Sequence, residues 1–114
     1  MSLIYKILSR DMWARAQHDG MFKGAAIDLT DGYIHLSTAA QAEETVRRHF
    51  VGQDELLLIA FDPADFVETL RWEASRGGAL FPHIYGNIKT EKALWVKELA
   101  LENGHHIFPE GWDQ

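Results

Sequence analysis

The segment Leu56-Leu57-Leu58-Ile59-Ala60-Phe61 places six apolar residues in succession, between Gly52 and Pro63. A run of this length is too short for an independent helix, and its apolar character on both alternating faces is typical of a strand buried on both sides. We therefore expect residues 56–61 to form the central strand of the fold, with the other elements packed around it.

The N-terminal part of the chain predicts a strand followed by a helix. Residues 3–8 mix β-favouring residues with a single charge, Lys6, which is the unusual member of that strand. Ser9 stands where a helix N-cap is expected, and Gly20 is suited to the C-terminal turn, which predicts a first helix of about ten residues.

The next segment predicts a loop, a short strand and a second helix. Residues 24–31 are expected to be a loop, and residues 32–37 a short strand that ends at a helix cap. Thr38 and Gln41 have the spacing of a capping box, in which a hydroxyl and an amide side chain satisfy free backbone N–H groups. The helix that follows should end before Gly52.

The C-terminal half predicts further extended segments. We expect a strand over residues 67–74, a turn at 76–78 and a short extended piece at 81–86. A helical turn from Thr90 and a strand over 95–99 should follow, and the last ten residues are expected to form an edge strand or a tail. Most connections are too short for repeated crossovers, which favours an α+β fold over a doubly wound parallel sheet.

Composition narrows the classes of function. The 114 residues fit one domain spanning 1–114; the chain has 11 Lys and Arg against 17 Asp and Glu, and it lacks Cys. The absence of Cys excludes disulfides and thiolate chemistry. A net charge of −6 speaks against a nucleic-acid partner, and no apolar run approaches the roughly 20 residues of a membrane span. We expect a cytoplasmic protein that does not enter a membrane.

His35 is the first candidate for chemistry, because neighbouring apolar residues would aim its ring from the opposite face of a strand. Ser37 and Thr38 follow at a helix start, where free backbone N–H groups attract a phosphate or another anion. The alternative is structural: His35 satisfies a backbone carbonyl, while Ser37 and Thr38 only cap the helix.

His83 and Tyr85 form the second candidate pair, since residues two apart on a strand share a face. Together they would clamp an aromatic ring or a ribose, or else simply pack in the core. Glu73 is a candidate carboxylate that orients or activates an acceptor hydroxyl, with a solvated strand-end carboxylate as the alternative.

The remaining histidines do not predict a metal site. His18 and His49 lie near helix ends, where solvated side chains are expected, and the adjacent His105 and His106 would face opposite sides of a strand. A metal-dependent hydrolase using His35 and His83 is a third hypothesis, but a third ligand has no obvious source in the sequence.

Several of these segments together resemble the domain-of-unknown-function family 952. The resemblance covers nearly the whole chain and is carried by Leu3-Ile4-Tyr5, Trp13, residues 31–38, the strand at 56–61, Trp72-Glu73 and residues 81–86. That family is similar in fold to the ADP-ribosyltransferases, and Ile34-His35-Leu36-Ser37 looks like the His-Leu-Ser segment of RNA 2′-phosphotransferases, which transfer an RNA phosphate to NAD. The resemblance implies a split, mostly antiparallel sheet with short flanking helices.

What the resemblance implies about function is a crevice for NAD or an ADP-ribose-like nucleotide, with NAD as a substrate and ADP-ribose transferred. His35, Glu73 and His83 would be the catalytic residues, and Lys6, Ser37, Thr38 and Tyr85 would bind the nucleotide. Many relatives carry His where this chain has Lys6, which keeps a donor and adds a positive charge that suits a phosphate. The alternative is a catalytically silent module of the same fold that binds a ligand or a partner protein.

Overall fold

The computed structural model describes residues 2–113 and every side chain among them except that of Arg76. Strand β5 (Leu56–Phe61) lies at the centre of this structure. It pairs antiparallel with β1 (Ile4–Ser9) on one side and β9 (Trp95–Glu102) on the other, in a five-stranded sheet of order β10-β9-β5-β1-β4. All six residues of β5 are buried, which confirms the prediction of a central strand.

The remaining elements are short. The helices are α1 (Arg10–Asp19), α2 (Ala26–Asp31) and α3 (Ala39–His49), with 3-10 turns at Pro63–Phe66, Arg76–Gly78 and Thr90–Lys92. The other strands are β2 (Met21–Phe22), β3 (Ile34–His35), β4 (Ser37–Thr38), β6 (Leu70–Ser75), β7 (Ala79–Ile84), β8 (Ile88–Lys89) and β10 (His105–Ile107). The fold is therefore α+β, as the short connections predict. None of the helices in residues 2–113 is long and apolar enough to cross a membrane.

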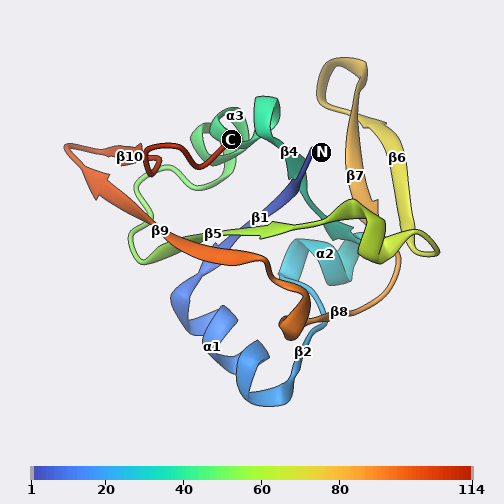
Figure 1. Cartoon of the computed structure of the whole chain (residues 1–114). Coiled ribbons are helices and arrows are strands. Elements are labelled where there is room, and N and C mark those ends of the chain that lie inside the picture. The colour runs from blue at the N-terminus through green and yellow to red at the C-terminus, as the bar shows by residue number, and fades with distance from the viewer. Residues whose placement is uncertain (1, 114) are drawn as a thin grey trace.

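The central sheet has a core on each face, because successive side chains of a strand point to opposite sides. Ile59 and Phe61 pack on the side of α1, whereas Leu58 and Ala60 pack on the side of α3. Figure 1 shows α3 on one side of the sheet and α1 on the other. The antiparallel sheet is thus buried on both faces at β5.

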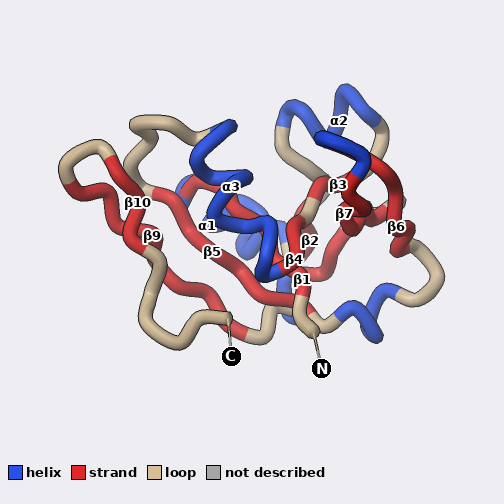
Figure 2. The backbone as a smooth tube through the Cα atoms, turned by 90° about the horizontal axis from the view of Figure 1, so that it is seen from above, coloured by secondary structure: helices blue, strands red, loops and turns tan. Residues whose placement is uncertain are grey.

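A second sheet branches from the first at Leu36. β3 pairs with β7 in a three-stranded sheet of order β3-β7-β6, while β4, one residue later, pairs with β1 of the central sheet. The sequence predicts one short strand over 32–37, but the chain changes sheets within it, with the Leu36 N–H donating to the carbonyl of Pro82 at 3.0 Å. Figure 2 shows the two sheets diverging from this point.

Residues 24–31 are not the loop that the sequence predicts, since α2 occupies Ala26–Asp31. Its apolar residues Ile27 and Leu29 are exposed and Asp28 is buried, which inverts the usual amphipathic pattern. The Asp28 carboxylate accepts a hydrogen bond from the Ala25 N–H at 2.8 Å and so holds the start of the helix. A buried polar anchor of this kind leaves no hydrophobic period in the sequence. At the other end of the chain, β10 pairs with β9, so the last residues include an edge strand.

The first helix forms as predicted, with Ser9 as its N-cap and Gly20 in the left-handed region at φ 78°. The Ser9 hydroxyl accepts from the Met12 N–H at 3.1 Å. We expect Ser9→Ala to lower the free energy of unfolding by about 1 kcal/mol, since it leaves a helix N–H without its partner. Urea denaturation followed by circular dichroism measures this change. Ser2→Ala is the matched control, and an equal loss in the two variants would contradict the capping role.

Candidate functional site

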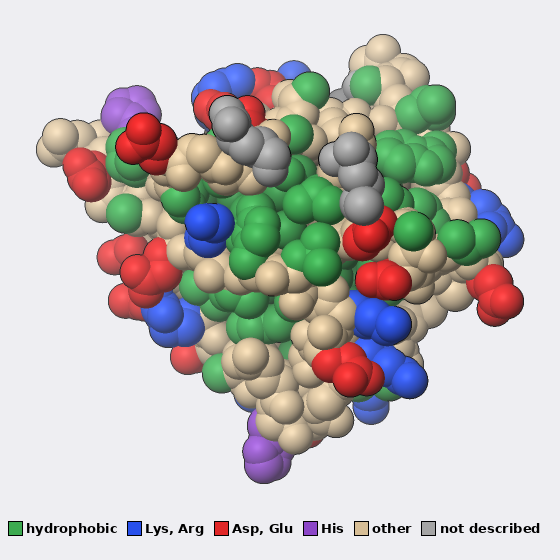
Figure 3. Space-filling model, in the orientation of Figure 1, with side chains coloured by type: hydrophobic (Ala, Val, Ile, Leu, Met, Phe, Trp, Pro, Cys, Tyr) green, Lys and Arg blue, Asp and Glu red, His purple; other side chains and the backbone are tan. Residues whose placement is uncertain are grey.

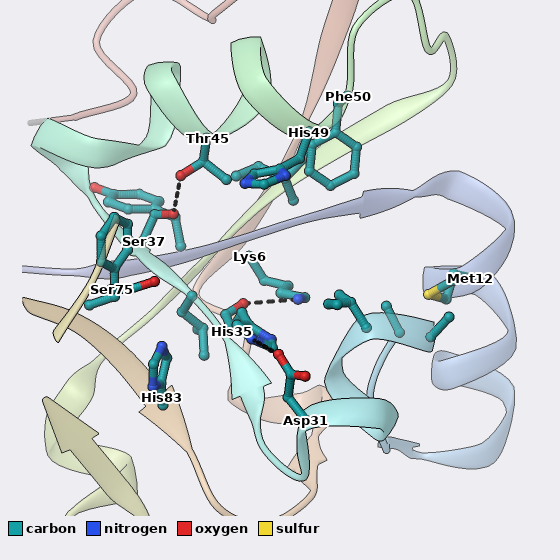
Figure 4. Close-up of a pocket in the computed structure, with 17 residues that line it drawn as sticks. Lys6, Met12, Asp31, His35, Ser37, Thr45, His49, Phe50, Ser75 and His83 are labelled. Atoms are coloured by element: carbon teal, nitrogen blue, oxygen red, sulfur yellow. Dashed lines mark hydrogen bonds and ion pairs between the residues drawn. The ribbon is translucent and has the colours of Figure 1, made fainter. Parts of the chain in front are cut away.

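A pocket of about 630 Å³ opens where the two sheets separate. Its walls come from strands β1, β3, β4, β6 and β7, from both ends of α2, from α3 and from one residue of α1, Met12. Figure 4 shows His35 and His83 reaching into it from β3 and β7, with His49 on the opposite wall. The register explains the convergence, because His35 lies directly opposite His83 on neighbouring antiparallel strands. The two imidazole ring centroids are 5.3 Å apart.

His83 is held by a carboxylate on the neighbouring strand. Its Nδ1 lies 2.7 Å from Oε1 of Glu73, and only 4 % of its side chain is exposed. The Tyr85 hydroxyl donates to both oxygens of the same carboxylate, at 2.8 and 3.1 Å. Hydrogen bonds from His83 and Tyr85 lower the pKa of Glu73, and the bond to Glu73 raises the pKa of Tyr85. Glu73 is therefore an ionised acceptor under neutral conditions.

His35 sits between two carboxylates. Its Nδ1 lies 2.6 Å from Oδ1 of Asp28, and its Nε2 lies 3.0 Å from Oδ2 of Asp31. The backbone N–H of His35 also donates to Asp28, at 3.1 Å. Ionised carboxylates only accept hydrogen bonds, so the ring satisfies both partners only when both of its nitrogens carry protons. Both ring nitrogens of His35 are thus engaged by carboxylates of α2.

Lys6 and Asp28 form a buried ion pair behind His35. The Lys6 Nζ lies 3.0 Å from Oδ2 of Asp28 and donates to the His35 carbonyl at 2.8 Å. Burial lowers the pKa of Lys6, and the neighbouring Asp28 opposes that shift. Burial by itself would raise the pKa of Asp28, but hydrogen bonds from His35, the charge of Lys6 and two backbone N–H donors lower it to about 2.

Tyr33 connects the two histidines, a role that the sequence did not predict. Its ring stacks on His83 at a centroid distance of 4.2 Å and lies 4.6 Å from the ring of His35. The ring centroid of Tyr85 lies 5.1 Å from that of Tyr33. Burial, followed by the charges of Asp31 and Glu73, raises the pKa of Tyr33. The aromatic rings restrict the rotamers of both histidines.

The predicted residues take different positions around the pocket. Lys6, His35, Ser37 and His83 line it, whereas Glu73 and Tyr85 support His83 from behind and Thr38 lies outside the lining. The hydroxyls of Ser37 and Thr45 are 2.9 Å apart, and the Thr38 N–H donates to Oε1 of Gln41 at 3.0 Å. These contacts are those of the structural alternative, a capped helix start.

Other pocket residues were not predicted from the sequence. Thr45, His49 and Phe50 line it from α3, and Asp31 lines it from α2. Helical spacing does place Thr45 and His49 four residues apart on one face, which is a signal compatible with this position. The buried acceptor Asp28 gives no comparable signal. Among residues 2–113, no three His, Cys, Asp or Glu side chains are arranged to hold a metal ion.

One family model and the solved structures of one bacterial protein match most of this chain. The family model described as "Protein of unknown function (DUF952)" matches residues 7–96. The crystal structure of protein CC0527 from Caulobacter crescentus is 46% identical, with a TM-score of 0.89 over 92% of this chain and 93% of that one. Its solution NMR structure gives a TM-score of 0.82 over 91% and 90% of the two chains. The comparison with curated proteins gave no match.

Proposed function

The chain belongs to the DUF952 family of proteins of unknown function, and from the geometry of its site we propose that it binds NAD or an ADP-ribose-like nucleotide. The observation that carries the proposal is the convergence of His35 and His83 on one pocket. Its volume, about 630 Å³, lies within the range of small-molecule sites. The sheets that part at this pocket support an ADP-ribosyltransferase-like fold, in which such a crevice holds the nucleotide.

The proposal gives the pocket residues distinct roles. His35 and the Ser37 hydroxyl face the ribose or its phosphates from the pocket lining, and Thr38, the next residue, contributes from outside that lining. Lys6 acts through His35, because its ammonium is held by Asp28 and by the His35 carbonyl. His83, with Glu73 and Tyr85, completes the ribose side of the pocket. We place this activity in the cytoplasm, where NAD is available.

The surface charge favours a small nucleotide over an RNA substrate. The chain carries a net charge of −6, and the face in Figure 3 shows acidic side chains mixed with the basic ones. An RNA backbone requires a continuous basic surface. In the transferase version of the proposal, ADP-ribose passes to an acceptor as nicotinamide leaves, and the pocket stabilises the oxocarbenium-like transition state.

One observation favours a catalytically silent binding module as the second candidate function. The ammonium of Lys6, at a position where the family resemblance implies His, is buried and held by protein acceptors. Such a group contributes no free donor to a reacting ribose. Binding of NAD without release of nicotinamide would favour the module.

Filling the pocket mouth tests the proposed site. Ala26 lines the pocket, whereas Leu29, on the same short helix, is exposed outside it. We expect NAD at ten times its Kd to stabilise the wild-type chain by about 1.4 kcal/mol, and Ala26→Trp to abolish that gain. Thermal shift assays with NAD and ADP-ribose at millimolar concentration measure the effect. Leu29→Trp should retain the shift, and a wild-type chain that neither nucleotide stabilises would refute the proposal.

A further inference from the structure

Resting on the proposed function, we propose that His83 is the general base that takes the proton from a neutral hydroxyl acceptor, water or an alcohol, while Glu73 and Tyr85 are positioning residues. The proposal assigns different roles to His35 and His83. It also assigns the acceptor class: a hydroxyl group, which needs a base to become a nucleophile.

The tautomer of His83 follows from its hydrogen bonds. Glu73 is an ionised acceptor, so the Nδ1 of His83, 2.7 Å from its Oε1, carries the proton of that bond. The Nε2 of the neutral ring then has a lone pair. No described side chain hydrogen-bonds this Nε2, and His83 lines the pocket. Figure 4 shows the ring extending from β7 toward the pocket.

Two other candidate groups of the site, His35 and Glu73, fit this role less well. Both ring nitrogens of His35 already face carboxylates, at 2.6 and 3.0 Å. Glu73 already accepts from His83 and Tyr85 and does not line the pocket, which makes it a poor direct base. Of these three groups, His83 is the best arranged to accept a proton, and Glu73 acts through it.

The orientation of the His83 ring is fixed from several sides. Its side chain is buried, Tyr33 stacks on it at 4.2 Å, and the paired strands β6 and β7 carry both Glu73 and His83. The Tyr85 hydroxyl contacts both oxygens of Glu73 and so restricts the rotation of that carboxylate. A general base with a locked tautomer needs little reorganisation when the proton moves.

The reaction balances with water as the acceptor. The water oxygen bonds to the ribose carbon, and the carbon–nitrogen bond to nicotinamide breaks, with its electron pair remaining on the ring nitrogen. The water proton moves to Nε2 of His83 and is then released to solvent. The products are ADP-ribose, nicotinamide and one proton; an alcohol in place of water gives the corresponding ADP-ribosyl ether.

The tautomer is measured without any ligand. Long-range ¹H–¹⁵N correlation spectra of the full chain should show the neutral His83 ring protonated at Nδ1, and Glu73→Gln should reduce that preference, because an amide both donates and accepts. Tyr85→Phe should leave the Nδ1 bond in place. A wild-type ring protonated at Nε2 would overturn the proposal, whatever the nucleotide does.

Turnover provides the second arm of the experiment. Nicotinamide release at saturating NAD should fall at least about 100-fold in His83→Ala. Azide should restore release in that variant, because this anion attacks without losing a proton, and the exposed His18→Ala is the control. A rate within threefold of wild type would overturn the base role alone. Absence of any nucleotide thermal shift would instead refute the proposed function, and binding without wild-type turnover would overturn the base role in favour of the silent module.

Discussion

Asp28→Asn should lower the free energy of unfolding by about 3–5 kcal/mol, the usual cost of leaving a buried charge without its partner. The side chains of Lys6 and Asp28 are 7 % and 1 % exposed, and their charged atoms lie 3.0 Å apart. Asparagine keeps the size of the side chain but has one oxygen acceptor, whereas the N–H groups of Ala25 and His35 bond to different oxygens of Asp28. The loss therefore combines the missing negative charge with a missing hydrogen-bond acceptor. Urea unfolding at pH 7 measures it.

Two further variants show whether the ion pair accounts for the change. Lys6→Met combined with Asp28→Asn removes both charges, and we expect the double variant to be more stable than Asp28→Asn alone. Asp19→Asn, at an exposed position, is the control and should change the free energy by less than about 0.5 kcal/mol. A double variant no more stable than Asp28→Asn would mean that the ammonium of Lys6 is not the group left unpaired.

Lowering the pH should remove the contribution of the Asp28 carboxylate to the free energy of unfolding. The pKa of Asp28 falls from 3.8 to about 2 in the folded chain, so the folded state binds fewer protons than the unfolded state between these values. Stability is then fully present above the unfolded pKa and is lost as the pH falls from about 5 toward 2. The contribution is about 2 kcal/mol.

Urea unfolding at several pH values between 7 and 2 tests this titration, with Asp28→Asn as the comparison. The wild-type free energy should fall more steeply with acid than that of the variant. Glu73 contributes in the same direction, since its pKa is also lowered, but its carboxylate is 40 % exposed. Parallel pH dependence in the two chains would show that Asp28 is not the group responsible.

The sequence predicts the candidate residues of the site but not the contacts between them. His35 and His83 were identified individually because each lies among apolar residues on an extended segment, and Glu73 and Tyr85 were identified beside them. Which residue each would contact was not predictable. Pairing of β6 with β7 brings Glu73 to His83, 10 positions away, and pairing of β3 with β7 brings His35 to His83, 48 positions away. The carboxylate partners of His35 come instead from α2.

Local pattern determined the buried strand at 56–61, the capped first helix, the α+β class and the candidate histidines, because these depend on residues that are neighbours in the chain. Tertiary structure decided that the strand around Leu36 divides between two sheets, and that Asp28 is buried beneath His35 against Lys6. The tertiary structure thereby decided that His35 faces two carboxylates and that His83 keeps one ring nitrogen toward the pocket. Hydrogen bonds to a buried side chain require no sequence period, so only the folded chain reveals them.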